Sequence, residues 1–131
     1  MKKTVFAAIA AAVCLAACQE SLEDRCAREA KSYTEKKCPA PIGDNITIDS
    51  VMFERSTHTM CYFYTLTGAA DSREAVEKSD PRAALLQSIR NSTAVKAYKD
   101  AGYSFRYTYF SGSKRGEILY SVTFKKGDYK S

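Results

Sequence analysis

The sequence predicts an α+β domain: a duplicated helix–hairpin unit whose four strands form an antiparallel sheet with two helices on one face. Two segments place apolar residues at spacings of three and four, as one face of a helix does. Each segment is followed by two runs rich in β-branched and aromatic residues, which is typical of a β-hairpin. Helices and antiparallel strands in such separate blocks favour a sheet with one covered face.

The first 17 residues predict a removable secretory leader. Lys2 and Lys3 precede an apolar run from Val5 to Ala17, which is shorter than the roughly 20 residues that a membrane-spanning helix needs. The run ends in the letters LAAC at 15–18, which resemble the lipobox of bacterial lipoproteins. An ordinary cleaved leader with an incidental cysteine is the alternative.

The lipobox resemblance implies cleavage between Ala17 and Cys18 and attachment of lipid, including palmitate, to Cys18. Residues 18–20 then form a lipidated tether to the membrane, and residues 21–131 form a single domain. Two or more acyl chains hold a protein durably at a bilayer. Gln19 stands where an aspartate would resemble an inner-membrane retention signal. We therefore expect a lipid-anchored protein of the bacterial cell envelope, at the outer membrane rather than the inner one.

The charge balance argues against a nucleic-acid partner. Without Lys2 and Lys3, the chain keeps 18 basic and 15 acidic residues, a net charge of +3, and the two signs are interspersed. Two basic pairs, Lys114-Arg115 and Lys125-Lys126, have the charge to contact anionic lipid or an acidic partner. Solvated hairpin and terminal charges are the simpler interpretation of both pairs.

The first unit begins with a helix predicted over residues 21–37. Its apolar stripe is formed by Leu22, Cys26, Ala30 and Tyr33. Ser21 begins a pattern that resembles a capping box, and Pro39 ends the helix. The strands that follow are predicted over 45–54 and 59–67, with the polar letters RSTH between them.

A polar, alanine-rich connector over residues 68–79 separates the two units. The second helix is predicted to start at Asp80, because an N-cap acceptor followed by Pro81 favours a helix start. Asn91-Ser92 marks a break within it, and Gly102 is placed to end it.

The second hairpin, over residues 103–110 and 117–124, predicts which face of the sheet meets the helices. Alternation places a largely aromatic set on that face: Tyr103, Phe105, Tyr107, Tyr109, Ile118, Tyr120, Val122 and Phe124. The opposite face stays open, and its candidate binding residues are Phe63, Arg106, Phe110 and Leu119. This mixed surface suits a protein or glycan partner, although scattered exposed apolar residues are also normal in monomers.

Four stretches of the chain resemble a family of small Gram-negative envelope proteins. They are KKCPAPIGDNITIDSV, YFYTLTG, VKAYKDAGYSFRYTYF and GDY, within about residues 37–129. Members share a helix that ends in Cys-Pro, a Tyr-x-Tyr-Thr-Leu strand and a terminal Asp-Tyr. The resemblance implies the fold and the compartment, and it brings no established activity. Cys26 and Cys61 depart from the family pattern.

Three cysteines remain after the leader, in an oxidising compartment where disulfides form. On a helix over 21–37, Cys26 and Cys38 are about 18 Å apart along the axis, beyond the limit of about 7 Å for a bridge. Any bond must use Cys61, whose place in the strand alternation points it away from the helices. The candidate disulfide therefore joins Cys38 to Cys61 around an edge of the sheet, and free thiols are the alternative.

Catalytic and metal chemistry find little support in the sequence. His58 is the only histidine and Cys61 lies three positions later, so their side chains face opposite sides of a regular strand. A zinc site built from these two residues and the other cysteines lacks the paired ligand spacing of structural sites. We expect no cofactor. The sequence predicts a non-catalytic interaction or inhibitor module, with a periplasmic thiol-dependent hydrolase using Cys61 and His58 as the alternative.

Overall fold

The computed structural model describes residues 20–130, so Ala17 and Cys18 lie outside the described residues. Its centre is one sheet of five strands in the order β1-β2-β3-β4-β5. The strands are β1 (Ala40–Gly43), β2 (Ile46–Glu54), β3 (Thr59–Leu66), β4 (Ser104–Ser111) and β5 (Ile118–Phe124). The helices are α2 (Leu22–Lys37), α3 (Arg73–Ser79), α4 (Pro81–Asn91), α5 (Lys96–Asp100) and α6 (Lys126–Tyr129), with 3-10 turns η1 (Arg55–Thr57) and η2 (Gly68–Ala70). None of these helices combines the length and the apolar character needed to cross a membrane.

The fold is α+β, but the sheet differs from the prediction in strand number and in strand direction. The prediction of four strands and two helices is matched only roughly, because β1 adds a strand and the second helix is divided. β3 and β4 pair in parallel, whereas all other neighbours in the sheet are antiparallel. Parallel neighbours need a crossover connection, and η2, α3, α4 and α5 provide it. The fully antiparallel prediction is therefore wrong at the centre of the sheet.

Helix α2 confirms the predicted first helix to within one residue. Ser21 is the N-cap, and its hydroxyl accepts a hydrogen bond from the N–H of Asp24 at 3.1 Å. Cys26 and Ala30 on the predicted stripe are buried at 0% and 3% exposure. The stripe therefore faces the core, as the spacing of its apolar residues predicts.

Strand β1 covers only the beginning of β2, where Ala40 lies opposite Ile48. Pro41 has no N–H to donate, which confines such a strand to the edge of a sheet and makes the segment look like a loop in the sequence. Further along β2, Thr34 of α2 replaces β1. Its Oγ1 donates to the carbonyl of Val51 and accepts from the N–H of Val51, both at 2.8 Å. Helix α2 thereby closes the part of the edge that β1 leaves open.

The crossover consists of short helices that follow the capping signals in the sequence. Ser72 caps α3 with its side chain. Asp80 turns the chain with a positive φ of 45°, and Pro81 begins α4 at the predicted position. The break predicted at Asn91-Ser92 is confirmed, because α4 ends at Asn91 and α5 starts anew at Lys96.

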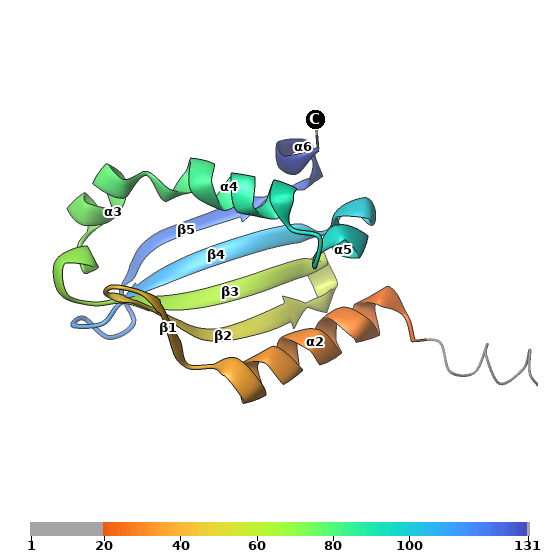
Figure 1. Cartoon of the computed structure of the whole chain (residues 1–131), viewed down its shortest axis with the longest axis horizontal. Coiled ribbons are helices and arrows are strands. Elements are labelled where there is room, and N and C mark those ends of the chain that lie inside the picture. Colours follow the sequence, from red (N-terminus) through yellow and green to blue (C-terminus); the bar gives the residue numbers. More distant parts are fainter. Residues whose placement is uncertain (1–19, 131) are drawn as a thin grey trace, which may run out of the picture.

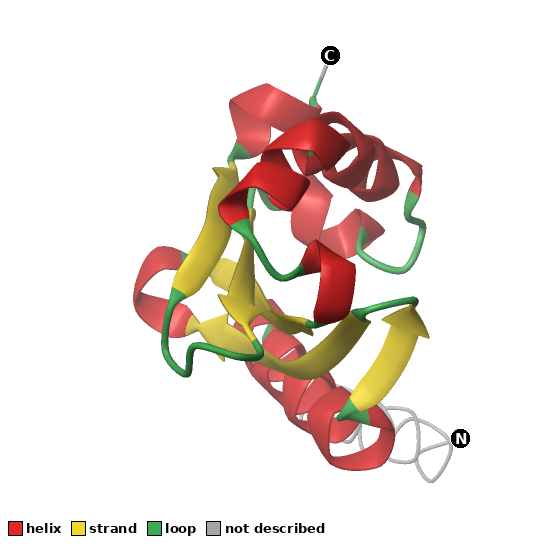
Figure 2. Cartoon of the chain, turned by 90° about the vertical axis from the view of Figure 1, so that its left-hand side faces the viewer, coloured by secondary structure: helices red, strands yellow, loops and turns green. Residues whose placement is uncertain are grey.

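One buried cluster joins the helices to one face of the sheet, called the helix-side face below. The helices contribute Cys26, Ala30, Val76, Ile89 and Tyr98 to it. The sheet contributes the aromatic residues predicted for this face, with Phe105 and Phe124 at 0% exposure. Figure 1 shows α2 along β2 and α3 and α4 along β5, with β3 and β4 between them. The side view in Figure 2 shows the curved sheet with α2, near the N-terminus, at one margin and the other helices at the opposite margin.

We predict that Thr34→Val lowers the free energy of unfolding by about 1–3 kcal/mol, because the N–H and the carbonyl of Val51 both lose their partner. Thr34→Ser keeps the hydroxyl and is expected to cost less than about 1 kcal/mol. Urea unfolding followed by circular dichroism measures both values. Equal stability of Thr34→Val and the unmodified chain would contradict the edge-closing role of Thr34.

Candidate functional site

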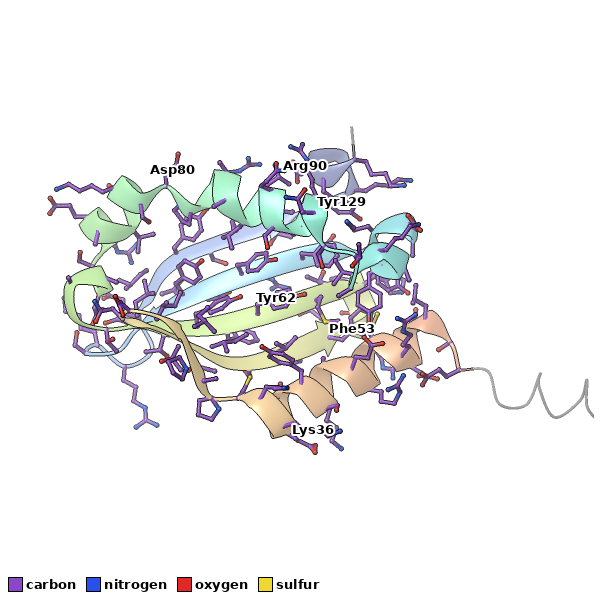
Figure 3. The ribbon with its side chains drawn as sticks, in the orientation of Figure 1. Lys36, Phe53, Tyr62, Asp80, Arg90 and Tyr129 are labelled. Atoms are coloured by element: carbon purple, nitrogen blue, oxygen red, sulfur yellow. The ribbon has the colours of Figure 1, made fainter. Side chains whose placement is uncertain are left out.

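A groove of about 570 Å³ lies over the centre of the helix-side face. Its floor is formed by side chains of the two central strands: Met60, Tyr62, Tyr64, Phe105, Tyr107 and Tyr109. Its walls come from α2 with Glu29, Ala30 and Tyr33, and from α4 with Leu85, Ser88 and Ile89. Figure 3 shows Tyr62 on the sheet between α2 and α4. The volume falls in the range of about 300–1,000 Å³ that is usual for ligand pockets.

The parallel pairing of β3 and β4 determines the floor of the groove. It sets Tyr62 opposite Tyr107 and Tyr64 opposite Tyr109, so the same face of both strands is aromatic. The rings of Tyr62 and Tyr107 stack with centroids 4.8 Å apart and an angle of 11° between their planes. Tyr64 and Tyr109 meet edge to face at 5.1 Å. These contacts hold the rings as a continuous aromatic surface.

The tyrosine hydroxyls are the polar groups of this floor. In residues 20–130, the hydroxyls of Tyr62, Tyr64 and Tyr107 form no hydrogen bond with another residue, although Tyr129 donates to the carbonyl of Tyr103 at 2.7 Å. Burial raises the pKa of Tyr62, Tyr64 and Tyr107 well above the usual range. The phenols therefore stay protonated, and each can donate a hydrogen bond to a molecule in the groove.

Glu29 supplies the charged group of the wall. It accepts hydrogen bonds from the hydroxyl of Tyr98 at 2.5 Å and from Arg25 at 2.6 Å. Burial alone would raise the pKa of this carboxyl, but the hydrogen bonds from Tyr98 and Arg25 outweigh burial, and the net pKa is lowered. Glu29 is therefore an ionised and already paired group.

The rim of the groove exposes apolar side chains to water. Tyr33 is 42% exposed and Ile42 is 53% exposed. Ile42 belongs to β1, the strand that the sequence did not predict. Exposed apolar residues beside a groove are typical of a surface that binds another molecule.

The open face of the sheet holds three of the four predicted binding residues. Phe63 and Phe110 are half-buried, with rings stacked at 6.2 Å. Arg106 of β4 pairs with Glu54 of β2 at 3.4 Å, while its Nε is buried without a partner among the described residues. These side chains form a shallow mixed surface rather than a groove.

Leu119 lies in the core and not on the open face, which corrects the prediction for this residue. The register between β4 and β5 shifts beside Tyr109 and Phe110, so that Phe110 lies opposite Ile118. A shift by one residue reverses which side chains face the core. Leu119 is consequently 7% exposed and joins the buried cluster, whereas Ile118, predicted for the helix-side face, is 45% exposed.

The structure contradicts the candidate disulfide between Cys38 and Cys61. Cys26, Cys38 and Cys61 are all free thiols. Cys38 packs at the margin of the helix-side cluster, whereas Cys61 lies on the open face beside Arg106, its partner in the parallel register. The sheet separates the two sulfur atoms, because β3 is an interior strand and the chain offers no path around an edge.

His58 and Cys61 are also kept apart. The imidazole of His58 stacks on Tyr103 at 4.7 Å and forms a hydrogen bond with Glu23 of α2, so it lies on the helix side. The Sγ of Cys61 contacts the carbonyl of Thr59 at 3.7 Å, and burial raises the pKa of this thiol. A thiol nucleophile activated by His58 is therefore not formed.

Within residues 20–130, no three His, Cys, Asp or Glu side chains come together in a way that could hold a metal ion. The sequence pattern does not predict the groove, because alternating tyrosines also suit ordinary core packing. The available signal was the number of tyrosines, nine in 131 residues. Tyrosine combines an apolar ring with a hydroxyl that needs a partner when buried, so such an excess indicates a binding surface as well as a core.

A family model described as Domain of unknown function (DUF8479) matches residues 21–120. The comparison with curated proteins found no match. Among solved structures, the chain is similar to a protein from Pseudomonas aeruginosa that is described as secreted, with 15% identity and a TM-score of 0.65 over 86% of this chain and 100% of that chain.

Two pilotins of type 2 secretion systems also have a similar structure. EpsS from Vibrio vulnificus is 10% identical, with a TM-score of 0.63 over 84% of this chain and 93% of its own. AspS from Vibrio cholerae is 19% identical, with a TM-score of 0.58 over 82% of this chain and 91% of its own. At these identities, the likeness is one of fold.

We predict that a thiol reagent at neutral pH labels Cys38 in the folded protein and leaves Cys26 and Cys61 unlabelled. Cys38 is partly exposed, while Cys26 and Cys61 are buried at 0% and 1% exposure. Burial also raises the pKa of Cys26 to about 11, and the thiolate is the reactive form. Mass spectrometry of the peptides shows which cysteines are labelled first. The Cys38→Ser variant should be labelled only after unfolding in urea. Native labelling of Cys61 as fast as Cys38 would revive the thiol-enzyme alternative.

Proposed function

The chain belongs to the family described as Domain of unknown function (DUF8479), and we propose that it is a non-catalytic interaction module of the bacterial cell envelope. Its binding site is the groove between α2 and α4, and its partner is a protein that inserts an apolar segment there. The observation that carries this proposal is the floor of stacked tyrosines whose hydroxyls have no partner among the described residues. These hydroxyls are open to the groove, so a segment bound there can accept hydrogen bonds from them while its apolar side chains pack on the tyrosine rings.

The shape of the site favours the apolar face of a helix as the occupant. Neighbouring strands are about 4.8 Å apart and packed helices about 8–10 Å apart. β2 and β5 are therefore about 14 Å apart, less than the roughly 16–20 Å that a third helix packed between two others needs. A bound helix would lie above the groove and insert only its apolar face between α2 and α4. Helix-in-groove binding uses apolar anchors at helical spacing, which match the aliphatic and aromatic walls of this groove.

A glycan, the other partner class considered from the sequence, fits the groove less well. Sugars need several polar groups that converge on their hydroxyls. The walls offer Ser88 and Ser92, and Glu29 is already paired with Tyr98 and Arg25. Apart from the tyrosine hydroxyls of the floor, the remaining lining is aliphatic or aromatic, which favours a protein segment over a sugar.

The envelope location rests on two supports. The fold resembles a protein described as secreted and two pilotins of type 2 secretion systems. The letters LAAC at 15–18 further support a lipid on Cys18 and an anchor at the outer membrane. Helix α2 begins at Leu22, so a lipid on Cys18 would hold the folded domain close to the bilayer.

We predict that a photo-crosslinking residue at position 88 captures a discrete partner in intact cells. Ser88 is exposed and lines the groove from α4, so a bulky probe there leaves the core unchanged. Ala83, exposed on the same helix but outside the groove lining, is the matched control position. Crosslinks at position 88 and not at 83 are expected on denaturing gels.

A companion substitution tests the same site by loss of binding. Leu85→Arg places a charge in the apolar wall and should abolish the position-88 crosslink, while Ala83→Arg should retain it. Buried charges without partners are strongly unfavourable. Crosslinks at position 83, or at position 63 on the open face, without crosslinks at position 88 would show that the partner binds outside the groove.

We predict that intact-mass analysis of protein from its native host finds a chain that starts at Cys18 and carries diacylglycerol. Cys18→Ser should release the domain from the membrane fraction, because the acyl chains supply the anchoring free energy. A leader still attached, or an unmodified thiol at Cys18, would refute the anchor and leave the groove proposal standing.

A further inference from the structure

A second hollow lies at the end of the domain from which the tether leaves. It has a volume of about 390 Å³ between the end of α4, the helix α5 and the C-terminal residues of the described chain. Its charged lining is cationic, with Arg90, Lys96, Lys99 and Lys130 against the single carboxylate of Asp100. We call it the basic pocket. Figure 3 shows Arg90 and Tyr129, two of its lining residues, near the C-terminus.

The cations of the basic pocket are only partly engaged within the protein. Lys96 pairs with Asp100 at 2.7 Å. Arg90 donates to the carbonyl of Asp128 at 2.9 Å, and Lys99 donates to the carbonyls of Ile89 and Arg90 at 2.8 and 3.1 Å. These carbonyls carry no net charge, so they do not cancel the charge of Arg90, while Lys99 also interacts with the carboxylate of Asp100. A guanidinium has five N–H donors and an ammonium three, which leaves donors for an anion.

Lys130 is in no ion pair among residues 20–130, although its charge, with those of Lys96 and Lys99, helps to lower the pKa of the Asp100 carboxyl. The nearby carboxylate of Asp128 is occupied by Arg82 at 3.7 Å and by the N–H of Lys125 at 2.8 Å. Lys125 and Lys126 are exposed on the same C-terminal segment. The pocket and its surroundings therefore have a clear excess of positive charge.

Contacts within the fold place the basic pocket at the tether end. β3 and β4 start together there, because the N–H of Ser104 donates to the carbonyl of His58 at 2.9 Å. His58 in turn contacts Glu23, in the first turn of α2. On α5, Tyr98 reaches Glu29 of α2, while Lys96 and Lys99 line the pocket. Residues 18–20 span at most about 10 Å, so a lipid on Cys18 would keep this end of the domain near the bilayer.

We propose that the basic pocket binds the phosphate of an anionic phospholipid headgroup and so orients the domain on the membrane. The proposal rests on the lipid anchor proposed above, which brings the pocket to the bilayer surface. Arginine and lysine groups that converge in a hollow match the phosphate oxygens of such a headgroup. Each basic side chain close to an anionic membrane adds to the attraction, so the pocket supplements the acyl chains. The groove between α2 and α4 then stays free for a partner.

The experiment uses residues 18–131 with Cys18→Ser and sedimentation with vesicles at low salt. One vesicle population is phosphatidylcholine alone, and the other contains equal parts of phosphatidylcholine and phosphatidylglycerol. We expect binding to the second population only. The double variant Lys96→Gln and Lys130→Gln should bind roughly tenfold to thirtyfold more weakly, given the contribution of each lysine near an anionic surface.

The matched control is Lys36→Gln with Lys37→Gln, which removes the same charge from the last turn of α2, away from the pocket. This control should bind as the parent chain does. An equal loss in both double variants would show general charge attraction and would overturn the pocket. Inorganic phosphate that moves the NMR signals of Asn91 and Lys130 as strongly as short-chain phosphatidylglycerol does would assign the pocket to free phosphate and overturn the lipid headgroup.

These outcomes are separate from those that test the proposed function. The vesicle assay uses a chain without lipid and with an unchanged groove, so it reports on the pocket even if Cys18 is never acylated. The crosslinks at position 88 and the intact mass of the native protein report on the groove and on the anchor. Each of the three statements can therefore fail alone.

Discussion

The parallel pairing of β3 with β4 is the constraint on which the rest of the structure depends. It brings two strands that are 45 positions apart, counted from Thr59 to Ser104, to the centre of one sheet with their aromatic residues in phase. Parallel neighbours cannot be joined by a tight turn, so the chain must return along the sheet as α3, α4 and α5. That return places α4 opposite α2 and leaves the aromatic rows of β3 and β4 between them.

The two faces of the sheet have different capacities for binding because of this arrangement. The helix-side face has depth, since α2 and α4 form walls, and its tyrosines carry unpaired hydroxyls in the described chain. The open face is shallow, with Phe63 stacked on Phe110 and Cys61 buried beside Arg106. Buried thiols without an activating base are inert. The helix-side face is thus the deeper of the two, and His58 and Cys61 are not brought together for thiol chemistry.

The starts of α2, β3 and β4 lie together at one end of the sheet. The N-terminal turn of α2, the start of β3 and the start of β4 are joined through Glu23, His58 and Ser104. With the tether leaving from this end, the domain would stand with its basic pocket towards the bilayer. α2 and α4 extend away from that end, so the groove would open to the side, where a partner can reach it. Anchor, orientation and binding then use separate parts of one small domain.

Local signals in the sequence determined the secondary structure. Ser21 caps α2 with its side chain, and Pro39 and Pro81, which lack an N–H, mark helix ends, whereas the predicted side-chain cap of Asp80 is not formed. Alternating residues mark β2, β3, β4 and β5. Such signals act over a few neighbouring residues. Only the tertiary structure decided the direction of β4 beside β3, the edge strand β1 with its Pro41, and the bulge that buries Leu119 in place of Ile118. These depend on pairing and packing between residues far apart in the chain, and so does the groove, which exists only where the crossover leaves two strands uncovered.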